Sequence, residues 1–235
     1  MNNLNQNTIG ENVKRIRELI GEAAIATGRK PDDITLVAAA KTKPAYYIKQ
    51  AIRAGVDAVG ENRVQEMIGK RAEGAYDGAP LHFIGHLQSN KVSKIVGVCD
   101  LIESVSSKTL VESIGKRAEF LGIVQNILIE VNIGREAQKS GVMPEQTEEI
   151  LYLASQLRSI KVLGLMTIPP FFQENKKNCY YFDTMFQLFV DMSAKKYDNV
   201  SVRLLSMGMS DSYTDAIRAG SNMVRIGSAI FGERV

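Results

Sequence analysis

The sequence predicts an α/β protein, a single-domain (β/α)8 barrel that spans residues 1–235 and carries one extra helix at its amino end. Eight short runs rich in Val, Ile and Leu alternate with longer amphipathic segments, which is the pattern of repeated strand-then-helix units. The length of 235 residues suits such a barrel as one domain, and no low-complexity linker divides the chain. No Gly-x-Gly-x-x-Gly sequence follows the first predicted strand, which disfavours an open dinucleotide-binding sheet.

The elements are expected in a simple order. An opening helix is predicted over residues 8–28, because small and branched apolar residues recur there at helical spacing. Eight strands are predicted after it, at 34–41, 58–62, 81–86, 101–105, 126–132, 162–168, 202–208 and 223–228.

Helix signals lie between these strands. Pro44 and Pro144 suit the first turns of helices, and Ser106 or Ser107 can cap a helix that runs to Phe120. A one-faced stripe of aromatic and methionine side chains is expected to be core packing: Phe182, Met185, Phe186, Phe189 and Met192.

Composition excludes several classes of function. The chain has 29 Lys and Arg against 26 Asp and Glu, and the basic residues are scattered, so nucleic-acid binding is not expected. Cys99 and Cys179 lie far apart without a Cys-x-x-Cys pair, which predicts reduced, packed thiols. Residues 1–7 show no secretory signal, and no apolar run approaches the length of a membrane span. We therefore expect a cytoplasmic protein that does not bind membranes. A monomer is also expected, although nothing in the composition fixes the oligomeric state.

Lys41 is the most informative residue. It follows the apolar run Ile34 to Ala40 and precedes Thr42-Lys43-Pro44, so its amine is expected where a buried strand meets the start of a helix. Burial disfavours the charged form of an amine and leaves an electron pair able to condense with an aldehyde. A Schiff-base lysine is one interpretation, and a lysine that merely extends from the strand end to solvent is the other.

The ends of the last two predicted strands suit a phosphate group. In (β/α)8 barrels the loops after strands seven and eight frequently hold phosphate, together with the start of a short helix. The segments Ser206 to Ser210 and Gly227 to Phe231 offer glycines for close backbone approach and hydroxyls that donate to phosphate oxygens. In the alternative interpretation these glycines only shape turns, and the serines cap helices.

Arg225 interrupts the otherwise apolar strand Met223 to Ile226, so its side chain is expected to point inward. If a pyridine ring lay in the barrel mouth, the guanidinium would donate to the ring nitrogen and keep it unprotonated. Alternatively, Arg225 pairs with an internal carboxylate such as Glu130 and ties the barrel together.

Asn62 and two histidines are weaker candidates. Asn62 either caps a helix that starts at Arg63 or contacts a bound ring. His82 and His86 share strand parity and could face the same way, but two histidines without a third ligand make a poor zinc site. No metal site is expected, and His86 is expected near the mouth.

Several segments, in this order, resemble the pyridoxal phosphate homeostasis protein family. They are Ala39-Ala40-Lys41-Thr42-Lys43-Pro44, Gly60-Glu61-Asn62, His82 to Lys91, Gly164-Leu165-Met166-Thr167, Leu205 to Asp211 and Met223-Val224-Arg225-Ile226-Gly227. The resemblance implies a barrel like the amino-terminal domain of alanine racemase, with pyridoxal 5′-phosphate (PLP) bound to Lys41 as an internal aldimine. It also implies phosphate contacts from Ser206, Gly227 and Ser228, and an Arg225 contact to the pyridine nitrogen. The family usually has threonine where this chain has Ser228, and serine keeps the hydroxyl.

The resemblance implies a protein that binds PLP, supports vitamin B6 balance and supplies PLP-dependent apo-enzymes, without a catalytic residue of its own. An amino-acid racemase is the alternative, but racemisation needs a second acid/base, which alanine racemase takes from a further domain. The chain ends seven residues after Ser228, so that domain is not expected. A third possibility is an aldolase-like barrel, in which Arg225 would have no pyridine nitrogen to contact.

Overall fold

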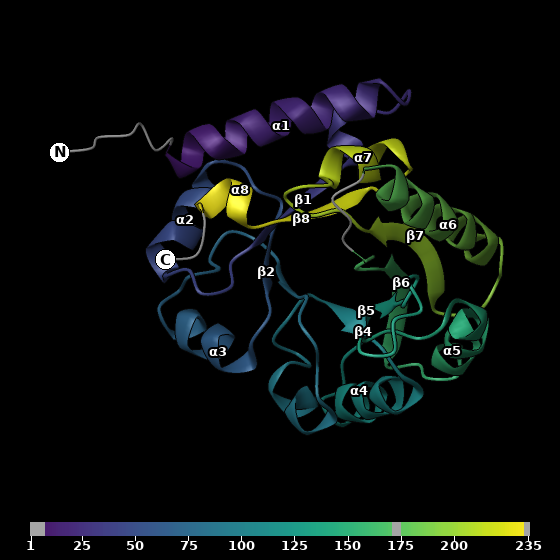
Figure 1. Ribbon diagram of the computed structural model, residues 1–235. Coiled ribbons are helices and arrows are strands. Elements are labelled where there is room, and N and C mark those ends of the chain that lie inside the picture. Colours follow the sequence, from purple (N-terminus) through teal and green to yellow (C-terminus); the bar gives the residue numbers. More distant parts are fainter. Residues whose placement is uncertain (1–7, 171–174, 233–235) are drawn as a thin grey trace.

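Eight parallel strands close into a barrel in which each strand pairs with the next along the chain and β8 pairs with β1 (Figure 1). The computed structural model describes residues 8–170 and 175–232, with the backbone alone described for residues 175–178. Residues 1–7, in which we saw no secretory signal, lie outside the described residues. The strands are β1 (Thr35–Ala39), β2 (Ala58–Glu61), β3 (Leu81–Phe83), β4 (Leu101–Val105), β5 (Gln125–Glu130), β6 (Ile160–Met166), β7 (Val200–Ser206) and β8 (Met223–Ile226).

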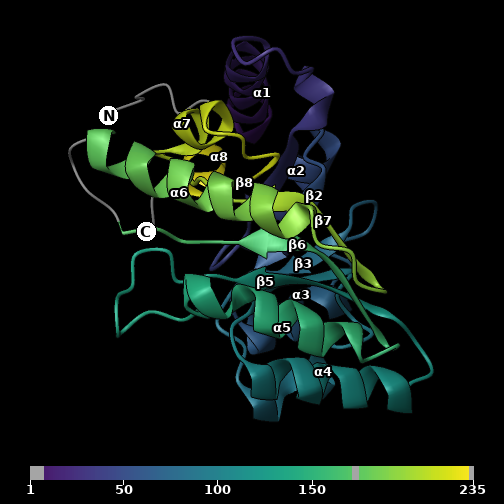
Figure 2. The same ribbon diagram turned by 90° about the vertical axis from the view of Figure 1, so that its right-hand side faces the viewer.

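Helices form the layer outside the strands, and α1 lies across α7 and α8 (Figures 1 and 2). The α-helices are α1 (Ile9–Ile25), α2 (Ala45–Arg53), α3 (Val64–Ala72), α4 (Lys108–Phe120), α5 (Thr147–Ser155), α6 (Asn175–Ser193), α7 (Tyr213–Arg218) and α8 (Ser228–Phe231). The 3-10 helices in the described part of the chain are η1 (Pro31–Asp33), η2 (Ser89–Lys94) and η3 (Pro144–Gln146). Within the described ranges, no helix is both long and apolar enough to cross a membrane.

The predicted (β/α)8 barrel with an extra amino-terminal helix is confirmed. Thr8 caps α1 through a reciprocal pair of bonds with Glu11, and Ser107 caps α4 by accepting a bond from the backbone N–H of Leu110. The buried face of α1 carries the apolar residues whose spacing predicted the helix. The predicted helix ran three residues too far, because α1 ends at Ile25 and a turn follows.

Most strands end earlier than predicted. β1 stops at Ala39, β3 at Phe83 and β8 at Ile226, so Lys41, His86 and Ser228 lie in the segments after the strands. The apolar pattern continues past the last ladder hydrogen bond and therefore does not mark the strand end. Lys41 and His86 consequently lie in the segments that follow β1 and β3, and Ser228 begins α8.

Alternate residues of each strand face the barrel interior. Val37, Leu101, Leu128 and Met223 belong to a buried apolar cluster that is separate from the larger core between strands and helices. On β8, Arg225 is two residues after Met223 and therefore shares its side of the strand. The apolar interior thus gives way to charged groups toward the mouth.

Candidate functional site

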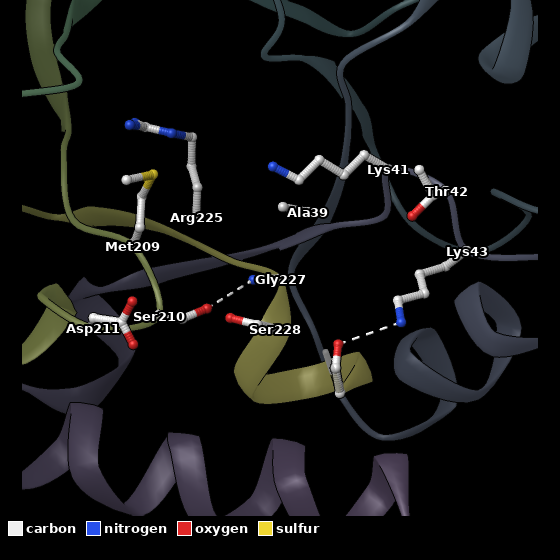
Figure 3. A pocket seen from close by; sticks show the side chains of 11 residues that line it. Ala39, Lys41, Thr42, Lys43, Met209, Ser210, Asp211, Arg225, Gly227 and Ser228 are labelled. Carbon is white, nitrogen blue, oxygen red and sulfur yellow. Dashed lines mark hydrogen bonds between the residues drawn. The ribbon is translucent and has the colours of Figure 1, made fainter. Parts of the chain in front are cut away.

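A cavity of about 200 Å³ opens at the carboxyl ends of β1 and β8 (Figure 3). It is lined by Ala39, Lys41, Thr42, Lys43, Met209, Ser210, Asp211, Arg225, Gly227, Ser228 and Gly232. The structure therefore brings together four of the residues singled out in the sequence, which are Lys41, Arg225, Gly227 and Ser228. Ser206 and Asn62 are not among the lining residues.

Lys41 stands two residues past the end of β1. The backbone N–H of Ala40 still donates to the Gly60 carbonyl at 2.9 Å, so the barrel holds the chain up to the residue before Lys41. Thr42 then adopts a left-handed backbone conformation, with φ of 62°. Figure 3 shows the Lys41 side chain directed toward Arg225, whereas Lys43 points toward the end of α8. The Lys43 Nζ donates to the carbonyls of Phe231 at 3.1 Å and Gly232 at 3.3 Å.

The start of α8 presents backbone N–H groups to one point. The amides of Gly227 and Ala229 both donate to the Ser210 hydroxyl, each at 3.3 Å. Gly227 has little room for a side chain, because a Cβ atom there would lie 3.2 Å from the Ala39 carbonyl oxygen. Converging amides and hydroxyls suit an anionic oxygen.

Gly208 makes the turn that carries Ser210. Its φ of 99° lies in the region that favours glycine, and a Cβ atom would lie 2.7 Å from the Ala216 Cβ. Its carbonyl also accepts a bond from the Arg225 backbone N–H at 3.0 Å. This glycine therefore sets the path between β7 and the cavity.

Arg225 belongs to a buried chain of polar groups inside the barrel. Its guanidinium donates to the Ser206 hydroxyl and, at 2.9 Å, to the Thr167 carbonyl. Ser206 in turn donates to Glu103 at 2.6 Å, and the other carboxylate oxygen of Glu103 lies 2.7 Å from the His82 Nδ1. Ser206, which was expected to contact phosphate, is fully buried, and it does not line the cavity.

Two carboxylates influence Arg225. Glu103 lies 3.9 Å from the guanidinium, and Glu130, the carboxylate considered from the sequence, also acts on Arg225 through its charge. Burial raises the pKa of Glu103, but the hydrogen bond and charge of His82, with Arg225 and Ser206, outweigh it and lower the pKa overall. Burial raises the pKa of Glu130 to about 6, against the opposing charge of Arg225.

Asn62 and His86 do not belong to this group of hydrogen-bonded polar residues. The Asn62 Oδ1 is buried and has no hydrogen-bond partner within the described residues. Gly85 lets the segment after β3 pass close to Asn62, since a Cβ atom there would lie 2.1 Å from the Asn62 carbonyl oxygen. His86 is exposed and lies 2.9 Å from the Ser140 hydroxyl, whereas His82 is buried, so the two histidines do not share a site. Residues 8–170 and 175–232 contain no group of three or more potential metal ligands.

Glu103 was not predicted from the sequence. Its signal is the same as that of Arg225: a charged residue interrupts the apolar strand Leu101–Val105 at a position that faces the interior. Ser210 was included only as part of a segment, although its hydroxyl is the one that reaches the start of α8.

Comparisons with known proteins identify the family. The family model for the amino-terminal domain of alanine racemase matches residues 4–235. A pyridoxal phosphate homeostasis protein of Aquifex aeolicus is 42% identical, covering 95% of this chain and 97% of its own. The protein of the same name from Escherichia coli K12 is 37% identical, covering 97% of each chain.

A solved structure of a related protein also matches this chain over nearly its whole length. The structure of PipY from Synechococcus elongatus PCC7942 with PLP bound is 30% identical, covers 96% of this chain and 100% of that chain, and superimposes with a TM-score of 0.83. The family model, the related sequences and this structure all cover nearly the whole chain. The chain therefore belongs to the pyridoxal phosphate homeostasis protein family.

Proposed function

We propose that this protein binds PLP in the cavity between β1 and β8, holds it through a Schiff base on Lys41, and supplies it to apo-enzymes without catalysing turnover. One observation carries the proposal. Lys41, Arg225 and the Gly227–Ser228 start of α8 line the same cavity, and they suit the aldehyde, the ring nitrogen and the phosphate of PLP. The names of the related proteins and the PLP-bound PipY structure support the same ligand.

The phosphate would lie at the start of α8. The N–H groups of Gly227 and Ala229 already donate to an oxygen there, that of Ser210. A phosphate oxygen could take the place of this hydroxyl oxygen, and Ser210 and Ser228 could then donate to the phosphate. Lys43 holds the other end of α8 by its bonds to Phe231 and Gly232, which fixes the helix that presents these donors.

Arg225 would set the protonation of the ring nitrogen. A guanidinium stays protonated in proteins and only donates hydrogen bonds, so the nitrogen it faces must act as an acceptor. PLP supplies an electron sink when its ring nitrogen is protonated, and Arg225 would weaken that sink. Ser206, Thr167 and Glu103 hold the guanidinium in place. We therefore assign Ser206 to positioning Arg225, and we leave Asn62, with its unpartnered Oδ1, as a candidate contact to the ring.

Two measurements on the purified protein test the function. PLP titration should produce a visible absorption band, and pyridoxal without phosphate should bind more weakly, because it cannot use the donors at α8. Incubation with alanine or serine in deuterated water should then show only slow exchange at the α-carbon by NMR. A turnover of about ten per second on alanine or serine, the median for enzymes, would instead support an amino-acid racemase.

A further inference from the structure

Two side chains of α3 hold the backbone on either side of Lys41. The Lys70 Nζ donates to the Ala40 carbonyl at 2.8 Å, and the Glu66 Oε2 accepts from the Thr42 N–H at 2.9 Å. Ala40 and Thr42 are the direct neighbours of Lys41 in the chain. Lys70 and Glu66 are one helical turn apart on α3, and their charged groups approach to 3.7 Å. A single helix therefore holds both flanks of the lysine.

A buried carboxylate fixes Lys70. The Lys70 side chain is 11% exposed, and its Nζ also donates to the Glu61 Oε1 at 2.7 Å. The Tyr76 hydroxyl donates to the same oxygen at 3.0 Å. Glu61 is fully buried at the end of β2, and burial raises its pKa, although Lys70 and Tyr76 oppose this effect. The ammonium is thus held between the barrel and the turn that carries Lys41.

This turn needs outside support. Thr42 has a φ of 62°, a conformation that is unfavourable for a β-branched residue. Buried ion pairs contribute little net stability compared with apolar packing, so stability alone does not explain the buried Lys70–Glu61 pair at this place. The bond from Lys70 to the Ala40 carbonyl does explain it.

We propose that Lys70 and Glu66 are positioning residues, which fix the turn so that the Lys41 amine enters the cavity. The inference rests on the proposed function, in which Lys41 bonds to PLP. Neither residue lines the cavity, so both act through Lys41.

The test compares Glu66→Ala with Glu66→Gln. Alanine removes the acceptor for the Thr42 N–H, whereas the amide oxygen of glutamine keeps it. Glu73→Ala is the matched control, because Glu73 is an exposed carboxylate at the other end of α3. In the unloaded protein, hydrogen exchange at the Thr42 amide should be about tenfold faster or more in Glu66→Ala, as expected for losing a hydrogen bond to a charged group. It should stay near the parent rate in Glu66→Gln and Glu73→Ala.

The second readout is the rate at which PLP bonds to Lys41, followed by stopped-flow absorbance. Glu66→Ala should be slower by about tenfold, and Glu66→Gln should recover most of the parent rate. Equal rates in Glu66→Ala and the parent, or an unchanged Thr42 exchange, would overturn the positioning role. A parent protein that forms no bond at Lys41 would overturn the proposed function itself, and this would be seen before any variant is made.

Lys70 can be tested without leaving a buried charge. Lys70→Ala alone leaves Glu61 without its cation, so a folding defect would obscure the result. The double variant Lys70→Met with Glu61→Gln removes both charges and keeps side chains of similar size. The double variant should still fold. Its bond to PLP should form more slowly than that of the parent, by a factor similar to that of Glu66→Ala. A folded double variant with the parent rate would contradict the role of Lys70.

Discussion

At the start of α8, one negative charge should be enough to weaken PLP binding. Ser228→Asp places a carboxylate against the phosphate, a repulsion of about 4 kcal/mol at about 4 Å and an effective dielectric constant of about 20. Ser228 is exposed, and solvent screening reduces this value, so we expect at least about a tenfold rise in Kd by equilibrium titration. Ser228→Thr keeps the hydroxyl and should bind as the parent does. Equal affinity for Ser228→Asp and the parent would exclude this phosphate position.

A substitution at Ser206 should affect the stability of the protein more than its affinity for PLP, in contrast to Ser228→Asp. Ser206 bonds to Arg225 and Glu103 inside the barrel, so Ser206→Ala should lower the free energy of unfolding by about 1–3 kcal/mol. Its effect on the Kd for PLP should be smaller than that of Ser228→Asp. A larger effect would return Ser206 to the phosphate site that the sequence suggested.

At the scale of the elements, one chain of polar groups ties four strands together. His82 on β3, Glu103 on β4, Ser206 on β7 and Arg225 on β8 form it. Glu103→Gln removes the charge beside a buried guanidinium and should destabilise the protein by about 3 kcal/mol. Urea unfolding measures this loss, and the exposed Glu119→Gln on α4 is the control. A loss no larger than the control's would show that Glu103 does not stabilise Arg225.

The elements also show what the sequence could predict. Apolar periodicity was enough for the barrel, because it reports burial directly. It did not fix the strand ends, because burial continues into the turns after Ala39 and Phe83, where Ala40 and Ile84 are buried. Lys41 and Arg225 were found because each is a charged residue in or beside an apolar run. Lys70 and Glu66 carry no such signal, because charged residues are common on helices and their contacts with the Lys41 turn depend on the tertiary fold.

At the scale of the whole molecule, the raised pKa of Glu130 predicts that the free energy of unfolding depends on pH. The pKa of Glu130 rises from 4.5 to about 6 on folding. Between these two pH values, the carboxyl is therefore still protonated in the folded protein but ionised in the unfolded chain. The free energy of unfolding should therefore fall as pH rises from about 4.5 to 6, by about 2 kcal/mol in total for this group. Glu130→Gln removes the contribution.

Urea unfolding of the parent and Glu130→Gln at several pH values isolates this effect from other titrating groups. The stability of the variant relative to the parent should increase by about 2 kcal/mol between about pH 4.5 and pH 7. A constant difference across this range would show that the Glu130 carboxyl titrates alike in the folded and unfolded protein.

The central claim is that Lys41 carries PLP, and one measurement tests it most directly. The PLP-loaded protein is reduced with borohydride, digested, and the modified peptide is sequenced by mass spectrometry. We expect the cofactor on Lys41, and we expect Lys41→Ala to lose both the modification and the visible absorption band while remaining folded. Lys43 is the internal comparison, because it lies two residues away but donates to carbonyls at the end of α8. Modification of Lys43 in the parent, or undiminished incorporation in Lys41→Ala, would contradict the assignment.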